Sequence, residues 1–380
     1  MKIVIIANGY PTKQEPQFGC FEKDQALALK KAGHDVSILY VDGRFRFYWR
    51  KLGITHLKDN GINVYGIFLF PLIFLSKLSF KLSHKVRNYM LERVFKYMLK
   101  KEDKPDIIYA HYLYNIANAI NIKEKYGIPL VGIEHWSMLN QPQLTSNIFY
   151  LGNIAYKKAD RILAVSNALA KSIQSHFCIN AIVVNDMVGE EFVRGCLSSP
   201  MNVSRFRFIA IGSLIPRKGF DLLINAFYKS ELFKKNCELI VIGGGTEQKK
   251  LQYLIDMYSL TDSIRLIGRK NKQEIISYLK QSHVFVLSSH VETFGVVCIE
   301  ALALGLPVVA TICGGPEEFI NDKNGLLVQI NNVDEMSSAM LKMYQNYSSY
   351  DRSSIAKECR DKFSPTVIIN QLTSIFKEII

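Results

Sequence analysis

Two glutamates stand eight residues apart in the segment 288–300, which reads SSHVETFGVVCIE. The apolar run 284–287 before it predicts a buried strand, and a helix is expected to begin near Phe294 and Gly295. Glu292 then lies in the turn, and Glu300 lies about one and a half turns into the helix. Both carboxylates could face one ligand, and carboxylates accept hydrogen bonds from sugar hydroxyl groups well. A solvated glutamate and a helix-capping glutamate would show the same spacing, so the pair alone leaves both interpretations open.

A basic pair follows another predicted strand. Arg217 and Lys218 lie in the segment 212–219 (GSLIPRKG), between the strand pattern 206–211 and the helical pattern 219–230. Such a pair can neutralise a diphosphate, because arginine offers a fork of donors and lysine a compact point charge. A solvated basic turn is the alternative interpretation.

Three consecutive glycines, 243–245, follow the strand pattern 238–242. Glycine lets a backbone approach a ligand closely. A tight turn would explain the same residues, so this motif is weak evidence by itself.

The elements that must position these groups alternate along the chain. Most strand patterns are near-continuous Val- and Ile-rich runs, as in parallel sheets that helices cover on both faces. Helical patterns lie between many of them, which is typical of a doubly wound α/β architecture. The predicted strands lie at 2–7, 35–41, 62–67, 106–110, 130–134, 161–165, 181–184, 206–211, 238–242, 264–267, 284–288, 307–310 and 325–329.

These strands are too many for one open sheet, so we expect two Rossmann-like domains. The segment 189–204, with small and polar residues, is the best linker candidate. We therefore expect a first domain over 1–187, to which a terminal helix at 363–380 returns, and a second domain over 204–362.

The charge of the chain is concentrated in one segment. The chain has 47 Lys and Arg against 34 Asp and Glu, and the segment 44–101 holds 13 of these basic residues but only two of the acidic ones, so it carries +11 of the net +13. Aromatic and aliphatic residues alternate with its cations, a pattern that suits an anionic membrane surface. A solvated helix face beside an ordinary core run is the alternative. Single-stranded nucleic acid would also suit the pattern, but no nucleic-acid motif accompanies it, so we expect no nucleic-acid partner.

The cysteines and the apolar runs bear on the compartment. The seven cysteines are widely spaced and form no CxxC, which indicates reduced thiols in a cytosolic setting. The longest apolar run, 67–75, spans nine residues and contains Pro71, whereas a membrane-spanning helix needs about 20. The first residues, MKIVII, are too short an apolar run for a signal peptide. We expect a cytoplasmic protein or one peripheral on the inner face of the membrane.

Four segments carry a resemblance to a known family. The runs GSLIPRKGFDLLINAF, LIVIGGG, IRLIGR and ETFGVVCIEALALGLPVVATICGGPEEFI closely resemble the retaining nucleotide-sugar glycosyltransferases of the GT-B fold, family 4 (glycosyl transferases group 1). The resemblance covers the whole chain in order and spacing, and it is tighter over 206–330 than over 1–185. It implies two Rossmann-like domains with a cleft between them, and transfer of a sugar from a nucleotide-diphosphate sugar with retention of configuration.

The resemblance also implies roles for matching residues. Arg217 and Lys218 correspond to the pair that stabilises the departing diphosphate, Glu300 to the carboxylate on the ribose, and Glu292 to a residue near the donor hexose. The other donor-binding positions that it implies are Gly19, Gly212, Ser213, Gly243, Arg269, Thr293, Phe294 and Gly295.

The first domain departs further from the family pattern. Phe18 and Gly19 match the expected glycine-rich loop, but the usual pair of glycines is absent. His111 and His135 each end a predicted strand, at positions where relatives place a histidine near the reaction centre. The resemblance implies a catalytic role for His111 and acceptor-side roles for Phe18, His135 and Trp136. A core histidine with satisfied hydrogen bonds is the alternative for each ring.

No Asp-x-Asp pair occurs in the chain. Transferases that hold a diphosphate through Mg²⁺ commonly need such oxygen ligands, so we expect no metal and no cofactor besides the nucleotide-sugar co-substrate. The expected acceptor is a glycan or lipid-linked glycan in bacterial surface polysaccharide synthesis. A sugar-nucleotide epimerase of the same fold and a non-catalytic basic adaptor are the alternatives. A dinucleotide dehydrogenase is disfavoured, because the first strand is followed by Asn-Gly-Tyr-Pro and not by G-x-G-x-x-G.

Overall fold

The computed structural model describes residues 1–46, 52–69, 79–195 and 204–380. Its contacts divide the chain into two compact units: a first unit of Met1–Asn185 with Pro365–Ile380, and a second unit of Asp186–Ser364. The predicted linker 189–204 is placed differently. Its first part forms helix α7 (Glu190–Arg194) of the second unit, which packs on a later helix of that unit, and its residues 196–203 lie outside the described residues.

The first unit contains an eight-stranded sheet in the order β3-β4-β2-β1-β5-β6-β7-β8. Every neighbouring pair is parallel except β3 with β4. The predicted parallel α/β architecture is confirmed, because strands buried on both faces need apolar residues at nearly every position. The strands are β1 (Lys2–Ala7), β2 (Asp35–Asp42), β3 (Gly53–Asp59), β4 (Ile62–Phe68), β5 (Ile107–His111), β6 (Leu130–Glu134), β7 (Arg161–Ala164) and β8 (Ile182–Val183).

Strand β3 is absent from the sequence prediction. It pairs antiparallel with β4 at the edge of the sheet, and its residues are exposed or half-buried. An edge strand needs no continuous apolar run, so the Val- and Ile-rich pattern does not detect it. The turn Asn60-Gly61 between the two strands, with positive φ at both residues, was the available signal for a hairpin.

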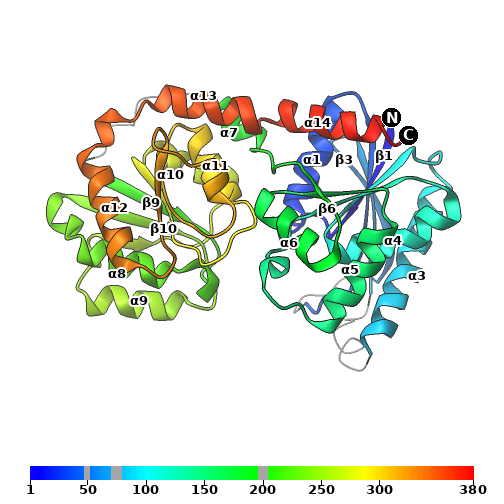
Figure 1. Ribbon diagram of the computed structural model, residues 1–380, viewed down its shortest axis with the longest axis horizontal. Helices are drawn as coiled ribbons and strands as arrows, with labels where there is room; N and C mark the ends of the chain where they lie inside the picture. The colour runs from blue at the N-terminus through cyan, green and yellow to red at the C-terminus, as the bar shows by residue number, and fades with distance from the viewer. Residues whose placement is uncertain (47–51, 70–78, 196–203) are drawn as a thin grey trace. The chain divides into compact units, whose positions relative to one another are not determined.

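Helices of the first unit surround this sheet (Figure 1). α1 packs against α14, the terminal helix, whereas α4 packs against both α3 and α5. Among the described residues, none of the helices is long and apolar enough to cross a membrane. The helices are α1 (Cys20–Lys31), α3 (Phe80–Met98), α4 (Leu113–Tyr126), α5 (Ser146–Lys158), α6 (Asn167–Phe177) and α14 (Pro365–Lys377).

The second unit contains a six-stranded sheet in the order β11-β10-β9-β12-β13-β14, and all its neighbouring pairs are parallel. This is the strand order of doubly wound dinucleotide-binding sheets. Its strands are β9 (Phe206–Ile211), β10 (Cys237–Ile242), β11 (Ile264–Leu266), β12 (Val284–Leu287), β13 (Val308–Thr311) and β14 (Gly325–Val328). Its further helices are α8 (Phe220–Lys229), α9 (Gln248–Met257), α10 (Lys272–Lys280), α11 (Val296–Ala303), α12 (Val333–Gln345) and α13 (Arg352–Phe363).

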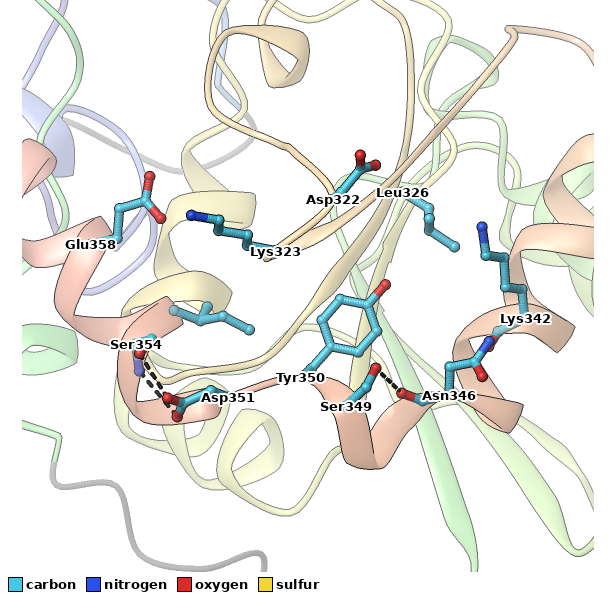
Figure 2. A pocket seen from close by; sticks show the side chains of 11 residues that line it. Asp322, Lys323, Leu326, Lys342, Asn346, Ser349, Tyr350, Asp351, Ser354 and Glu358 are labelled. Atoms are coloured by element: carbon cyan, nitrogen blue, oxygen red, sulfur yellow. Dashed lines mark hydrogen bonds between the residues drawn. The ribbon is translucent and has the colours of Figure 1, made fainter.

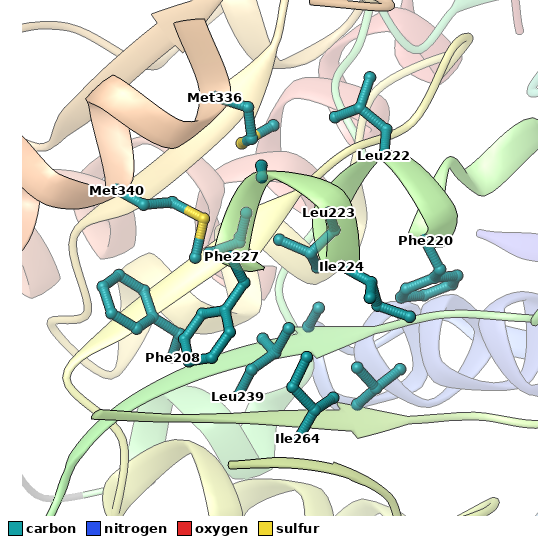
Figure 3. Packing of buried hydrophobic residues seen from close by; sticks show 14 of the residues in the cluster. Phe208, Phe220, Leu222, Leu223, Ile224, Phe227, Leu239, Ile264, Met336 and Met340 are labelled. Atoms are coloured by element: carbon teal, nitrogen blue, oxygen red, sulfur yellow. The ribbon is translucent and has the colours of Figure 1, made fainter. Parts of the chain in front are cut away.

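The core on one face of this second sheet is formed by α8, α9 and α12. Phe227 of α8 and Met340 of α12 are fully buried with Phe208 and Leu239 of the sheet (Figure 3). Burying each large apolar side chain contributes about 1.5–3 kcal/mol. The scaffold therefore holds β9 and β10 rigidly beneath the loops that follow them.

Candidate functional site

The predicted donor-site segments of the second unit meet at one edge of its sheet. β9 and β12 are parallel neighbours, but the chain continues from β9 toward β10 on one side and from β12 toward β13 on the other. The segments 212–219 and 288–295 therefore follow the carboxyl ends of two adjacent strands whose connections diverge. Ligands of open α/β sheets bind at such a switch point.

An ion pair joins these two segments. Lys218 Nζ contacts Glu292 Oε1, and the Ser289 hydroxyl donates to the same carboxylate oxygen at 2.7 Å. The Glu292 backbone N–H donates to the carbonyl of Cys313 at 2.9 Å. Glu292 is buried and Lys218 half-buried, so the carboxylate holds the ammonium group in a fixed place at the switch point.

Backbone contacts lock the same two segments together. The Ser288 hydroxyl donates to the Lys218 carbonyl at 3.0 Å, and the His290 N–H donates to the Arg217 carbonyl at 2.9 Å. Gly219 has φ +60°, and a Cβ there would lie 2.2 Å from the Ser288 carbonyl oxygen. Only glycine combines that conformation with that approach.

The remaining predicted donor-site residues of the second unit lie at the same edge. The Arg217 side chain is exposed, and the Arg269 side chain lies over Gly244. Gly243 packs so closely that a Cβ there would lie 1.8 Å from the Gly212 carbonyl oxygen. The structure thus brings four predicted segments to one edge of the sheet. The first holds Gly212, Ser213, Arg217 and Lys218, the second Gly243, the third Arg269, and the fourth Glu292, Thr293, Phe294, Gly295 and Glu300.

Helix α11 begins directly after Gly295, which has φ +96°. The ring of Phe294 does not face the edge; it is buried against Phe319 and Phe363, with ring centroids 5.2 and 5.5 Å away, so only its backbone remains for a ligand. Glu300 is half-buried in the second turn of α11. Cys313 accepts the backbone hydrogen bond of Glu292. Burial raises the pKa of the Cys313 thiol to about 12, so this thiol is protonated at neutral pH and is a poor nucleophile.

The histidines lie at the corresponding edge of the first unit. His111 ends β5, the neighbour of β1 where the strand order reverses. The rings of His111 and His135 are stacked with centroids 5.2 Å apart, and His111 Nδ1 lies 3.2 Å from His135 Nε2. His111 is fully buried, and this burial, with His135 next to it, holds its pKa well below the usual range. His111 is therefore neutral, and only the His135 ring is half-exposed.

A buried carboxylate supports the turn after His135. Glu134 Oε1 accepts hydrogen bonds from the backbone N–H groups of His135 and Trp136, both at 3.0 Å. Its Oε2 accepts one from the Tyr156 hydroxyl at 2.9 Å. Glu134 is fully buried, and burial raises its pKa. Its place in the interior gives it a structural part in positioning the exposed end of the turn.

The loop before α1 holds Phe18 and Gly19. Gly19 has φ +74°, and a Cβ there would lie 2.3 Å from the Gly9 carbonyl oxygen, which explains a glycine at this position. The Arg44 guanidinium stacks on the Phe18 ring at 3.0 Å from its centroid. The Trp136 ring lies at the same edge, 5.4 Å from the Tyr114 ring.

Sequence reasoning missed the residues that support the predicted ones. Ser289 lies within the quoted motif, so its position was visible, but its bond to Glu292 was not. Tyr156 lies 22 residues from Glu134, and no local pattern links a helix residue to a strand end at that separation.

A hollow of about 660 Å³ lies elsewhere in the second unit (Figure 2). It is lined by residues just before and at the start of β14, by α12 and α13, and by the turn between these two helices, including Lys323, Lys342 and Tyr350. It therefore lies toward the amino-terminal edge of the sheet, and none of the predicted site residues lines it.

Comparison with known sequences identifies relatives of both units. The family described as Glycosyl transferases group 1 matches residues 198–360, and the family described as Glycosyltransferase Family 4 matches residues 23–185. The putative teichuronic acid biosynthesis glycosyltransferase TuaC of Bacillus subtilis is 25% identical over 365 residues, which cover 90% of this chain and 89% of TuaC. An uncharacterised glycosyltransferase of Haemophilus influenzae is 26% identical over 88% of this chain and 89% of its own length.

Solved structures share the fold along the whole chain. Sucrose-phosphate synthase from Thermosynechococcus elongatus superposes with a TM-score of 0.77 at 16% identity, covering 100% of this chain and 98% of that one. Anabaena Alr3699/HepE in complex with UDP gives a TM-score of 0.76 at 17% identity and covers both chains fully. At such identities the likeness concerns the fold alone.

Proposed function

Because the chain belongs to the GT4-type glycosyltransferases of the GT-B fold, we propose that it is a retaining, metal-independent transferase. The donor is a nucleoside-diphosphate sugar, and the acceptor is a glycan or lipid-linked glycan of a bacterial surface polysaccharide. The observation that carries the proposal is the Lys218–Glu292 pair, which holds a cation between the two loops at the switch point of the second unit.

In this proposal Lys218 and Arg217 neutralise the diphosphate as it leaves. Cations that are already in place act on charge that develops in the transition state, without reorganisation at the moment of reaction. Lys218 must exchange Glu292 for the diphosphate, which leaves the Glu292 carboxylate available to accept a hydrogen bond from a donor hydroxyl. Glu300 binds the ribose hydroxyl groups. No metal ion is needed where two side-chain cations and a helix N-terminus meet the charge.

The ligands of two structural neighbours make UDP the first nucleotide to test. The structural neighbour Alr3699/HepE was solved with UDP, with UDP and glucose, and with UDP-glucose. A Staphylococcus aureus TarM mutant was solved with UDP and glycan ligands, at a TM-score of 0.68 and 14% identity. TuaC is named as a putative glycosyltransferase of teichuronic acid biosynthesis, which supports the proposed acceptor class.

The burial of His111 favours a positioning role for this residue. A fully buried neutral ring does not meet a substrate, but the contact of its Nδ1 with His135 Nε2 orients the His135 ring. His135 and Trp136 then face the acceptor.

The test begins with thermal unfolding of the full chain in the presence of UDP-, GDP- and ADP-sugars, since a ligand that binds the native state raises its stability. Turnover of the stabilising donor is then measured for Lys218→Ala and Glu300→Ala. Each variant should lose at least about tenfold, as expected for removal of a charge-assisted contact in the transition state. Wild-type rates in both folded variants would refute the site, and added EDTA should leave the rate unchanged.

An anionic membrane surface is the proposed partner of the first unit. On α3, Lys81, Lys85, Tyr89 and Arg93 recur at intervals of four residues, and all four are exposed. Such residues share one helix face, and a cationic face with exposed aromatic groups suits anionic headgroups. Of the basic segment 44–101, residues 47–51 and 70–78 lie outside the described residues.

Flotation with vesicles tests this partner. The full chain should float with vesicles of anionic phosphatidylglycerol and not with neutral phosphatidylcholine. Lys81→Glu/Lys85→Glu should abolish flotation, whereas the control Lys157→Glu/Lys171→Glu, which makes the same charge change at exposed positions of α5 and α6, should not. Equal recovery with both lipids, or with neither, would refute the membrane proposal.

A further inference from the structure

Arg87 is a half-buried cation at the carboxyl edge of the first sheet, and within the described residues it forms no ion pair with a carboxylate. It lies on α3, and its one hydrogen bond within the described part of the chain goes from Nη1 to the Val41 carbonyl, at 3.4 Å. A guanidinium has five N–H donors, so most of its hydrogen-bonding capacity is unused.

The carboxylate nearest to this group is already engaged. Asp42 ends β2 directly after Val41, and its two oxygens accept bonds from the Arg44 backbone N–H, Nε and Nη2 at 3.0, 2.9 and 2.8 Å. Burial lowers the pKa of Arg87, and the nearby Asp42 charge offsets only part of this effect. Charges removed from water are normally paired, so this only partly compensated guanidinium points to an anion that binds there.

Two aromatic side chains suited to a sugar lie at the same edge of the first sheet. Tyr114 opens α4 directly after the carboxyl end of β5, and within the described residues its hydroxyl has no hydrogen-bond partner. Helix α3 packs against α4, and the ring of Phe80 on α3 lies 6.4 Å from the Tyr114 ring. Arg87 follows Phe80 by seven residues and so shares its helix face. Burial raises the pKa of Tyr114, and the Arg87 charge lowers it against this larger effect. The Trp136 ring, 5.4 Å from the Tyr114 ring, offers an apolar face to a sugar.

We propose that Arg87 and Tyr114 form a subsite for an anionic group of the acceptor, either a phosphate or a sugar carboxylate. Arg87 binds two anionic oxygens as a fork, Tyr114 donates to one of them, and Trp136 lies against the adjoining sugar ring. The proposal rests on the proposed function for the identity of the ligand as an acceptor. It makes the enzyme selective for charged over neutral acceptors.

Trp136 provides a local probe. The chain has two tryptophans, so Trp49→Phe leaves Trp136 as the only indole. In this background the full chain is titrated with inorganic phosphate, with glucuronate and with glucose at constant ionic strength, up to about 50 mM, which saturates a millimolar site. We expect the Trp136 fluorescence to respond to at least one of the two anions and not to glucose. The anion that binds more tightly identifies phosphate or carboxylate as the natural group.

Substitutions then locate the response. Arg87→Gln should weaken anion binding at least about tenfold and Tyr114→Phe about threefold, as expected for a charged and a neutral hydrogen bond. The control is Arg161→Gln, at an exposed arginine that is the first residue of β7 and so lies at the amino-terminal edge of the sheet. It should leave the affinity for the anion unchanged. Arg87→Gln should unfold at the same temperature as the background or higher, because it removes an unpaired charge.

The subsite is overturned if neither anion gives a response, or if Arg87→Gln responds equally. Loss of the response in Lys218→Gln would also overturn it, because that would place the anion at the donor loops. A large fall in the unfolding temperature of Arg87→Gln would also overturn it, since Arg87 would then be structural. Calorimetry with nucleoside diphosphates separates this inference from the proposed function. Failure of the subsite leaves nucleotide binding intact, whereas failure of the proposed function removes it in every variant.

Discussion

Glu292→Gln should separate donor binding from sugar transfer. Lys218 is paired with Glu292 in the structure, and the two side chains are 16% and 10% exposed. Exposed ion pairs contribute less than about 1 kcal/mol, and breaking fully buried ones costs about 3–5 kcal/mol. A pair between these limits is expected to contribute about 2 kcal/mol, which a cycle of Lys218→Gln, Glu292→Gln and the double variant measures by urea unfolding.

The same pair opposes donor binding, because a diphosphate must displace the carboxylate from Lys218. Glu292→Gln removes that competition, so the affinity for a nucleoside diphosphate should rise by about tenfold, since 1.4 kcal/mol corresponds to tenfold. Turnover should nevertheless fall at least about tenfold, because the carboxylate near the donor sugar is lost.

Calorimetry with UDP, GDP and ADP measures the first effect and initial rates measure the second. Asp334→Asn is the matched control, because it breaks the exposed Lys229–Asp334 pair of the same unit and should change neither quantity. If Glu292→Gln weakens nucleotide binding as much as Lys218→Gln does, the proposed exchange of partners is wrong.

Two further predictions concern the supports of the two sites. Gly219→Ala should destabilise the second unit by more than about 2 kcal/mol, because the added Cβ would meet the Ser288 carbonyl oxygen. Gly268 also has positive φ but has open space around it, so Gly268→Ala should cost only about 1 kcal/mol. Equal urea midpoints for the two variants would contradict this. Glu134→Gln should be at least as stable as the parent at pH 8. Burial raises the pKa of Glu134 in the folded chain. The contribution of Glu134 to stability therefore falls as the pH rises from its unfolded-state pKa to its folded-state pKa. Toward pH 5 the free energy of unfolding of the parent should rise relative to that of Glu134→Gln. A difference in urea unfolding that does not depend on pH would contradict the account.

The parallel sheets were predictable because their strands are buried on both faces. Runs such as 2–7 and 206–211 are almost continuously apolar, and each became a central strand. Strand β3 was not predicted, because an edge strand carries polar residues and has no continuous apolar run. The Asn60-Gly61 turn was the sequence signal that indicated it.

The site was predictable to the level of its segments. Lys218 and Glu292 were both identified, but their direct pairing was not, because it depends on β9 and β12 being neighbours although their loops are 74 residues apart. Arg87 was counted only as part of a basic segment. That it forms no ion pair within the described residues becomes visible only when its surroundings are known, since the same arginine on a solvated face would need no partner.

Hydrogen–deuterium exchange of the full chain with and without a bound nucleoside diphosphate tests the central assignment most directly. Backbone amides that a ligand covers or orders exchange more slowly. The account predicts protection in 212–219 and 288–300, and loss of that protection in Lys218→Gln. Protection confined to other segments, such as those around the hollow at Lys323 and Tyr350, would contradict it.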